Sequence, residues 1–282
     1  NWCKAAEIAD SLGVDIITSS LGYNQFDDQS LNYTHSQLDG NTSYISIGAK
    51  TAVSKGIIVL NSAGNQGNSK WQKIGFPADV EEVLTISAIN KNGSPARFSS
   101  RGNNANQSIK PDVVALGVRA TVASPSGFYY QGNGTSFSTP IVAGGVACLL
   151  QAFPQLSPKK INDLIRQTAD DNTTPDSVIG YGVARFDIAF EYQNYLDKKT
   201  VRPHVFYSNP KEVVIFSGAA ESMDLLYYVN QKFLGFWKYR KKVSSKKGIT
   251  PSTVHYIKNS LNNSDTIKVK FYDKEGSSLK MK

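Results

Sequence analysis

The sequence predicts an α/β fold in which helices flank a parallel sheet, followed by a small β-rich domain. Apolar residues recur at helical spacing in Tyr44–Ser54, and the continuous apolar run Ile57–Ser62 follows directly. A helix followed by a fully apolar strand is typical of a parallel sheet covered on both faces. Charge also changes along the chain: residues 1–190 carry 14 Lys and Arg against 15 Asp and Glu, whereas residues 191–282 carry 17 against 8. We therefore expect a domain boundary near residues 190–200.

The length and composition are those of a globular protein. At 282 residues with 40% hydrophobic content, the chain can hold one large domain with a real core and a small appendage. It has no run of about 18 apolar residues, so we expect no membrane-spanning helix, and we find no signal peptide pattern. The two cysteines are Cys3 and Cys148. We expect Cys148 to be a small buried residue, and a Cys3–Cys148 disulfide is left open.

The first forty residues predict a helix, a strand and a long polar segment. The helix is Trp2–Leu12, with an apolar face formed by Ala5, Ile8, Ala9 and Leu12. Val14–Ser20 follows as a short, mostly buried strand. The polar segment Tyr23–Thr42 could be a metal-binding loop or the wall of a cleft, since it contains Asp27, Asp28, His35 and Asp39. Their spacing fits no standard metal motif, so we favour a solvated surface insertion.

Further elements follow towards residue 190. Val83–Ile89 is predicted as a strand, and Thr121–Gln131 as a β-hairpin. Ser157-Pro158 opens another helix, because Ser is a good N-cap and Pro fits the first turn. The apolar face of that helix comprises Ile161, Leu164, Ile165 and Thr168.

Residues 200–282 predict a small antiparallel β domain of unknown role. Its β-rich runs are His204–Tyr207, Val213–Phe216, Leu225–Val229, Phe233–Tyr239, Val254–Ile257 and Ile267–Tyr272. We identify no motif in them and interpret His204 and His255 as surface histidines. The excess of basic residues suits nucleic acid or acidic glycans, but a solvated basic face is the commoner meaning.

The stretch Gly132–Phe153 carries the strongest chemical signal. A polar, glycine-rich turn runs into the uncharged segment Ile141–Leu150, which predicts a helix buried on all sides. Within this helix we expect Gly144 and Gly145 to permit close approach of another backbone. Thr135 or Ser136 can cap the helix start. A Ser136 hydroxyl there also lies among unpaired N–H groups at the positive end of the dipole, which suits an oxyanion. Composition alone leaves both interpretations open, a capped core helix and a nucleophile.

The string Gly134–Pro140, followed by Val142–Gly144, resembles the nucleophile motif of the subtilisin-like serine proteases, the subtilases. The resemblance implies a subtilisin-like fold and a nucleophilic Ser136. Ser62–Gly67 is similar to the family's oxyanion segment, which implies that the Asn65 carboxamide stabilises the developing charge. Ser20-Leu21-Gly22 is similar to the segment that pairs with an extended substrate, and substrate binding by Ala63 and Gly64 is implied with it. The resemblance covers about residues 1–190.

Two expected motifs are missing. A serine nucleophile needs a base, and the base needs an orienting carboxylate. The family's Asp-Ser/Thr-Gly and His-Gly-Thr-x-Val-Ala-Gly motifs do not occur in this sequence, and His35 stands in neither. We therefore expect residues 1–195 to be the carboxy-terminal part of a catalytic domain, incomplete and inactive alone. The amino-terminal part of the same protease would carry the Asp and His.

The resemblance also implies partners and a location. We expect a polypeptide substrate, no nucleic acid partner and a secreted protein. No cofactor is assigned, no residue is named as a metal ligand, and a structural calcium ion is left open. Two other functions remain. One is a non-catalytic pseudoprotease that binds peptides, which intact Ser136 and Asn65 disfavour; the other is a glycan- or surface-binding module based on the basic β domain.

Overall fold

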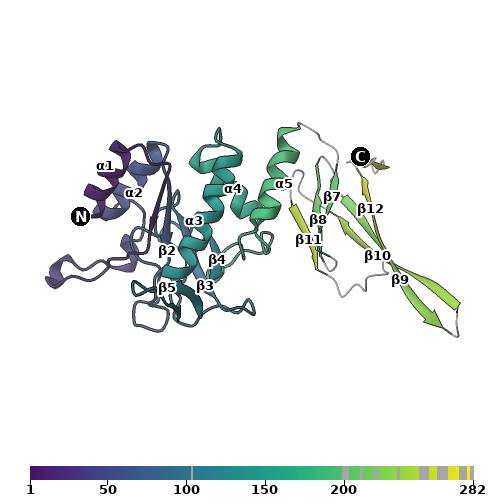
Figure 1. The fold of residues 1–282 in the computed structure, drawn as a ribbon, viewed down its shortest axis with the longest axis horizontal. Coiled ribbons are helices and arrows are strands. Elements are labelled where there is room, and N and C mark those ends of the chain that lie inside the picture. Colours follow the sequence, from purple (N-terminus) through teal and green to yellow (C-terminus); the bar gives the residue numbers. More distant parts are fainter. Residues whose placement is uncertain are drawn as a thin grey trace. The chain divides into compact units, whose positions relative to one another are not determined.

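The computed structural model shows a chain of two compact units, Asn1–Phe190 and Glu191–Lys282. Figure 1 shows both units and labels most of their helices and strands. The start of the predicted second domain, residue 200, lies outside the described residues. The structure describes residues 1–102, 104–198, 203–209, 212–218, 222–233, 236–247, 254–258, 266–272 and 278–279.

A parallel sheet forms the centre of the first unit, as the sequence predicts. Its strands lie in the order β1-β2-β3-β4, and each neighbouring pair is parallel. Every residue of β2 and β3 is buried, which explains their continuous apolar character. Helix α3 packs on all four strands, and α2 packs on β2. The bounds are β1 Ile16–Ser19, β2 Ile58–Ser62, β3 Leu84–Ile89, β4 Val113–Leu116, α2 Tyr44–Ser54 and α3 Thr135–Ala152.

The β1 side of this unit is more open than predicted. β1 pairs with β2 alone among the described residues, and only its Ser19 is buried, so the prediction of a mostly buried strand was wrong. Helix α1 (Trp2–Ser11) forms as expected but buries Ala6, while the predicted face leaves Ile8 and Leu12 exposed. The reason is packing against α2, where the Cys3 sulfur lies 2.5 Å from the place of a Cβ on Gly48.

Helix α3 is not buried on all sides, which corrects a second prediction. Its outward face exposes Ile141, which is 49% accessible, and Cys148, which is therefore not a buried residue. Cys3 and Cys148 are both free thiols. A Cβ on Gly145 would lie 2.3 Å from the Phe186 ring, and nothing lies within 4 Å of one on Gly144. At Gly145, therefore, the close neighbour is the Phe186 side chain and not another backbone.

Among the described residues, α3 also has the length and composition of a helix that could cross a membrane. The sequence prediction of no such helix rested on a stricter count of apolar residues. Length and composition are weak criteria here, because buried core helices share them, and α3 packs on the sheet.

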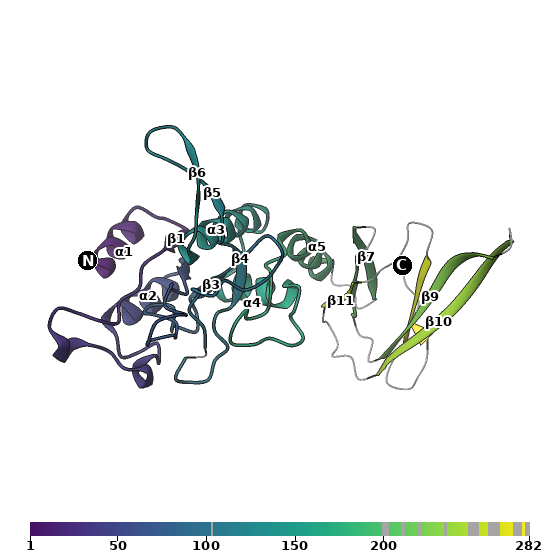
Figure 2. The same cartoon turned by 90° about the horizontal axis from the view of Figure 1, so that it is seen from below.

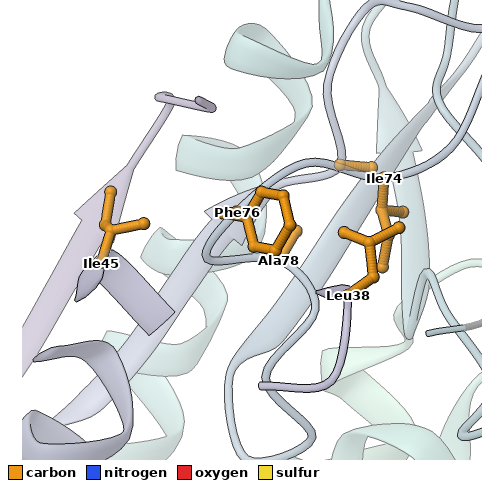
Figure 3. Packing of buried hydrophobic residues seen from close by; sticks show 6 residues of the cluster. Leu38, Ile45, Ile74, Phe76 and Ala78 are labelled. Carbon is orange, nitrogen blue, oxygen red and sulfur yellow. The ribbon is translucent and has the colours of Figure 1, made fainter. Parts of the chain in front are cut away.

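The segment of residues 23–42 is tied to the core rather than fully solvated. It forms two short 3₁₀ helices, η1 (Gln29–Leu31) and η2 (His35–Gln37). Leu38, directly after η2, is fully buried in an apolar cluster (Figure 3). In the part of the chain that is described, no three His, Cys, Asp or Glu side chains gather as metal ligands. The other buried members of the cluster are Ile45, Ala63, Ile74, Phe76 and Ala78.

Two buried carboxylates tie the loops of this unit together. Asp79 accepts hydrogen bonds from the Gly40 N–H at 2.8 Å and the Ser46 hydroxyl at 2.6 Å. Burial raises the pKa of Asp79 to about 6, against the opposing effect of those bonds. The Asp112 carboxylate forms ion pairs with Lys110 Nζ at 2.8 Å and with Arg166 Nη2 at 2.7 Å. Burial would raise the pKa of Asp112, but these two cations hold it below its usual range. The Asp112 network joins the start of β4 to helix α4 (Pro158–Thr168).

The remaining predicted elements of the first unit are confirmed, and one helix was missed. β5 (Ala120–Ala123) and β6 (Tyr129–Gly132) form the hairpin. Helix α4 (Pro158–Thr168) has Ser157 as its N-cap and buries the predicted face. Helix α5 (Phe186–Asp197), which the sequence did not predict, carries residues of both units.

After the end of α5, the described elements of the second unit are antiparallel strands, as predicted. Its sheets have the orders β10-β9-β12-β13 and β11-β8-β7. His204 is exposed, as expected, whereas His255 is buried, because it pairs with Ile215 of β8, the central strand of its sheet. The strands are β7 His204–Asn209, β8 Glu212–Phe216, β9 Ser222–Phe233, β10 Phe236–Lys247, β11 Val254–Lys258, β12 Thr266–Tyr272 and β13 Ser278–Leu279.

Candidate active site

The predicted site residues come together at the carboxyl ends of neighbouring parallel strands. Ser20–Gly22 follow β1, and Ala63–Asn65 follow β2, its neighbour in the sheet. Ser136 lies in the first turn of α3, which packs on both strands. The Ser20 hydroxyl donates a hydrogen bond to the Ser136 carbonyl at 3.3 Å. The fold thus joins segments that are more than a hundred residues apart in the sequence.

Thr135 links Asn65 to the start of α3. The backbone N–H of Thr135 and its hydroxyl each donate to Asn65 Oδ1 at 3.0 Å. Because an N–H can donate only to an acceptor, these bonds fix which end of the carboxamide is oxygen. The Nδ2 group of Asn65 therefore remains available as a donor. It lies 3.5 Å from the place of a Cβ on Gly134, which is ordinary van der Waals contact.

The first turn of α3 offers a second donor next to the Ser136 hydroxyl. Gly134 is the N-cap, and no side chain caps the helix, so the prediction of Thr135 or Ser136 as cap was wrong. Among the described residues the Ser136 N–H donates no hydrogen bond within the protein. Such unpaired N–H groups at a helix start favour negative charge. The Ser136 N–H and the Asn65 carboxamide are thus two donors on linked residues.

The loop after β2 is fixed from behind by Ser100. Gly64 has a φ of +107°, and a Cβ on it would lie 2.9 Å from Ser100 Oγ. The Ser100 N–H donates to the Gly64 carbonyl at 2.8 Å, and Ser100 Oγ accepts from the Gln66 N–H at 3.0 Å. The sequence did not reveal this supporting role of Ser100. Only glycine fits this conformation and this contact.

Ser136 has no base in the described residues of the first unit. Its hydroxyl forms no hydrogen bond with an imidazole there. His35 instead places Nε2 2.9 Å from the Trp71 carbonyl, with the two rings 4.5 Å apart. It lines a separate polar pocket with Lys73 and Asn104. The structure therefore brings the nucleophile and oxyanion residues together and leaves His35 elsewhere.

Ser20–Gly22 are exposed beside Ser136 and Asn65, and hydrogen bonds fix the carboxyl-terminal end of this segment. The Asn61 carboxamide donates to the Leu21 carbonyl at 3.0 Å, and the Tyr23 N–H donates to the Phe76 carbonyl at 3.3 Å. Tyr23 also lines an apolar pocket of about 290 Å³. Sequence reasoning missed this pocket, although its aromatic residues crowd residues 23–44. The pocket is lined by Asn1, Trp2, Cys3, Tyr23, Phe26, Tyr33, Tyr44 and Ile45.

Comparison with known proteins finds one family of serine proteases. The model of the subtilase family matches residues 3–182. Subtilisin E of Bacillus subtilis is 37% identical over 119 residues, covering 42% of this chain and 30% of its own. Subtilisin DY of Bacillus licheniformis has the same identity and alignment length, covering 41% of its own chain. Serine protease AprX of Bacillus subtilis is 33% identical over 178 residues, covering 56% and 38%.

Solved structures show the same fold. The Prenylagaramide maturation protease PagA superposes with a TM-score of 0.53 at 25% identity, covering 67% of this chain and 65% of that one. The self-cleaved protease domain of PatA gives 0.54 at 23% identity, covering 68% and 67%. This chain thus spans well under half the length of the curated relatives it matches and about two thirds of these structures.

Proposed function

Because this chain belongs to the subtilase family, we propose that the protein is a serine endopeptidase acting through Ser136. The observation that carries the proposal is the Asn65–Thr135 link, which holds a carboxamide beside the nucleophile. Ser136 Oγ would attack the peptide carbonyl while a base takes its proton. Asn65 Nδ2 and the Ser136 N–H would donate to the oxyanion. The base would then protonate the leaving amine, and water would release the acyl group.

The base and its orienting carboxylate would come from the amino-terminal part of the same protease. Two features of the first unit support this. β1 has a free edge among the described residues, and the outward face of α3 is apolar at Ile141 and Cys148. A free parallel edge and an apolar helix face together accommodate a further strand and helix. We propose that the segment carrying the His and Asp packs there.

The substrate would bind as an extended strand along Ser20–Gly22. Ala63 and Gly64 would contact it near the carbonyl group of the scissile bond. Main-chain hydrogen bonds would give affinity, and side-chain pockets would give specificity. The aromatic pocket that begins at Tyr23 lies next to this segment and suits a large apolar side chain. By family, we propose that the protein acts outside the cell.

The proposal is tested by hydrolysis of an internally quenched peptide by the full-length protein. We expect turnover by the wild type and none detectable for Ser136→Ala. Ser54→Ala, an exposed hydroxyl at the end of α2, serves as the matched control and keeps full activity. Peptide binding by the wild type without any cleavage would overturn the proposal and indicate a pseudoprotease.

A further inference from the structure

A β-hairpin directly precedes the nucleophile, and its tip carries three consecutive exposed aromatic residues. β5 and β6 pair from Ala120 with Gly132 to Ala123 with Tyr129. Phe128 is 74% exposed, Tyr129 80% and Tyr130 51%. Figure 2 shows the hairpin standing off the rest of the first unit. Single exposed apolar residues are ordinary, but three in a row where the projecting turn enters β6 indicate a contact surface.

The base of the hairpin is anchored by hydrogen bonds around Arg119. The Arg119 N–H donates to Asn133 Oδ1 at 2.8 Å, and its Nε donates to Gln131 Oε1 at 2.7 Å. The Gly134 N–H donates to the Gly117 carbonyl at 2.8 Å. These bonds close the hairpin just before α3 begins.

The residue after the nucleophile fixes the hairpin from the other side. A Cβ on Gly132 would lie 2.5 Å from the Phe137 ring, so that ring packs directly on the last residue of β6. The hairpin base and the Ser136 turn therefore form one packed unit. A partner bound at the hairpin tip would therefore lie at a defined position relative to Ser136.

The sheet order sets where a bound peptide would meet the hairpin. Ser20–Gly22 follow β1 at one end of the sheet, while the hairpin follows β4 at the other end. Three strand spacings of about 4.8 Å separate β1 from β4, roughly 14 Å in all. An extended peptide covers that distance in about four residues, at about 3.3 Å each. A substrate whose acyl side lies along Ser20–Gly22 and whose leaving-group side continues towards β4 would therefore reach the base of the hairpin at Gly132. Tyr129 lies three residues further along β6, about 10 Å from that base, or three more residues of an extended peptide.

We propose that Phe128 and Tyr129 bind the substrate polypeptide on the leaving-group side of the scissile bond and favour aromatic or large apolar side chains there. The proposal rests on the proposed function, since it needs a peptide to lie across Ser136. Neither outer edge of the two-stranded β5–β6 sheet is paired among the described residues, so its main chain is open to a third strand. Aromatic side chains of the substrate would pack on the exposed rings, a contact worth about two- to tenfold in affinity.

The first test measures binding, so that it does not depend on turnover. In the full-length protein with Ser136→Ala, two labelled peptides are compared by fluorescence anisotropy. They share an acyl side, and the fourth to seventh residues after the scissile position are either Phe and Tyr or Gly and Ser. We expect the aromatic peptide to bind about fivefold more tightly. The added changes Phe128→Ser and Tyr129→Ser should abolish that preference, while Leu31→Ser, at an exposed apolar residue of η1, should preserve it.

The second test measures cleavage with Ser136 intact. The changes Phe128→Ser and Tyr129→Ser should lower kcat/KM for the aromatic peptide about fivefold and leave an arylamide substrate, which has no leaving-side residues, unchanged. Equal binding of the two peptides by the unchanged hairpin would overturn the proposal, as would an equal loss on the arylamide. If the wild type cleaves nothing, the proposed function fails, while the binding comparison still decides the role of the hairpin.

Discussion

The two sides of the first unit differ in how completely they are packed. On the inner side, β2 and β3 are buried at every residue, and the loops that leave them hold Asn65 and Gly64 through bonds to Thr135 and Ser100. On the outer side, β1 is half exposed and Ile141 of α3 faces outward.

This difference separates the two halves of the proposed chemistry. Stabilising an oxyanion needs donors held rigidly in place, and the inner side holds them without any further segment. Proton transfer needs a base within hydrogen-bond reach of Ser136, and the described residues of this unit offer none. The outer side is where a segment carrying that base could pack. The following predictions test this division.

The largest expected effect concerns the inner side. Asn65→Ala removes a donor to the oxyanion and should lower kcat of the full-length protein about 10²–10³-fold, the loss known for such a donor in another subtilase. KM should change little. Steady-state kinetics on one peptide checks this, with Asn92→Ala, in an exposed turn, as control. A loss below threefold would show that the carboxamide does not face the oxyanion.

The outer side is tested by placing a charge on it. Ile141→Asp should cost the full-length protein about 3 kcal/mol of unfolding free energy, since a covered carboxylate lacks a partner. In the chain of residues 1–282 the same change meets water and should cost less than about 0.5 kcal/mol. Urea unfolding of both proteins measures the difference. Equal costs in the two would contradict a covering segment.

The buried Asp79 predicts a pH dependence of the inner side. Its folded pKa of about 6 lies above the ordinary value of 3.8, so the native state favours the protonated carboxyl. Its contribution to stability is complete below about pH 4 and is lost as the pH rises through 6, by roughly 3 kcal/mol. Asp79→Asn should flatten that part of the profile. Unfolding free energies from pH 4 to pH 7 for both proteins check this; parallel profiles would refute it.

The smallest effects come from two adjacent glycines of α3. Gly145→Ala would press a methyl group into the Phe186 ring and should cost about 1–3 kcal/mol. Gly144→Ala meets open space in residues 1–282 and should stabilise that chain by up to about 1 kcal/mol. Thermal unfolding of the two variants makes each the control of the other. Destabilisation by both variants would mean that the outer face of α3 is already covered.

The sequence predicted those parts in which local pattern and burial agree. Ile57–Ser62 reads as a buried strand because both of its faces are covered within this chain. The sequence predicted the buried faces of α1 and α3 incorrectly. An apolar pattern does not show which segment of a protein covers the helix face. Ile8 and Ile141 are apolar and yet exposed in this chain. Within the site, Ser136 and Asn65 came from a motif, whereas Ser100 and the aromatic pocket depend on tertiary contacts that no local spacing encodes.

The central claim is that this chain holds the oxyanion half of a serine protease site and needs another segment for the base. Labelling with a fluorophosphonate probe, read by intact mass and peptide mapping, tests it most directly. We expect an adduct on Ser136 in the full-length protein and no measurable adduct in residues 1–282 alone. Labelling of Ser136 at the same rate in both would contradict it, because the chain would then contain its own base.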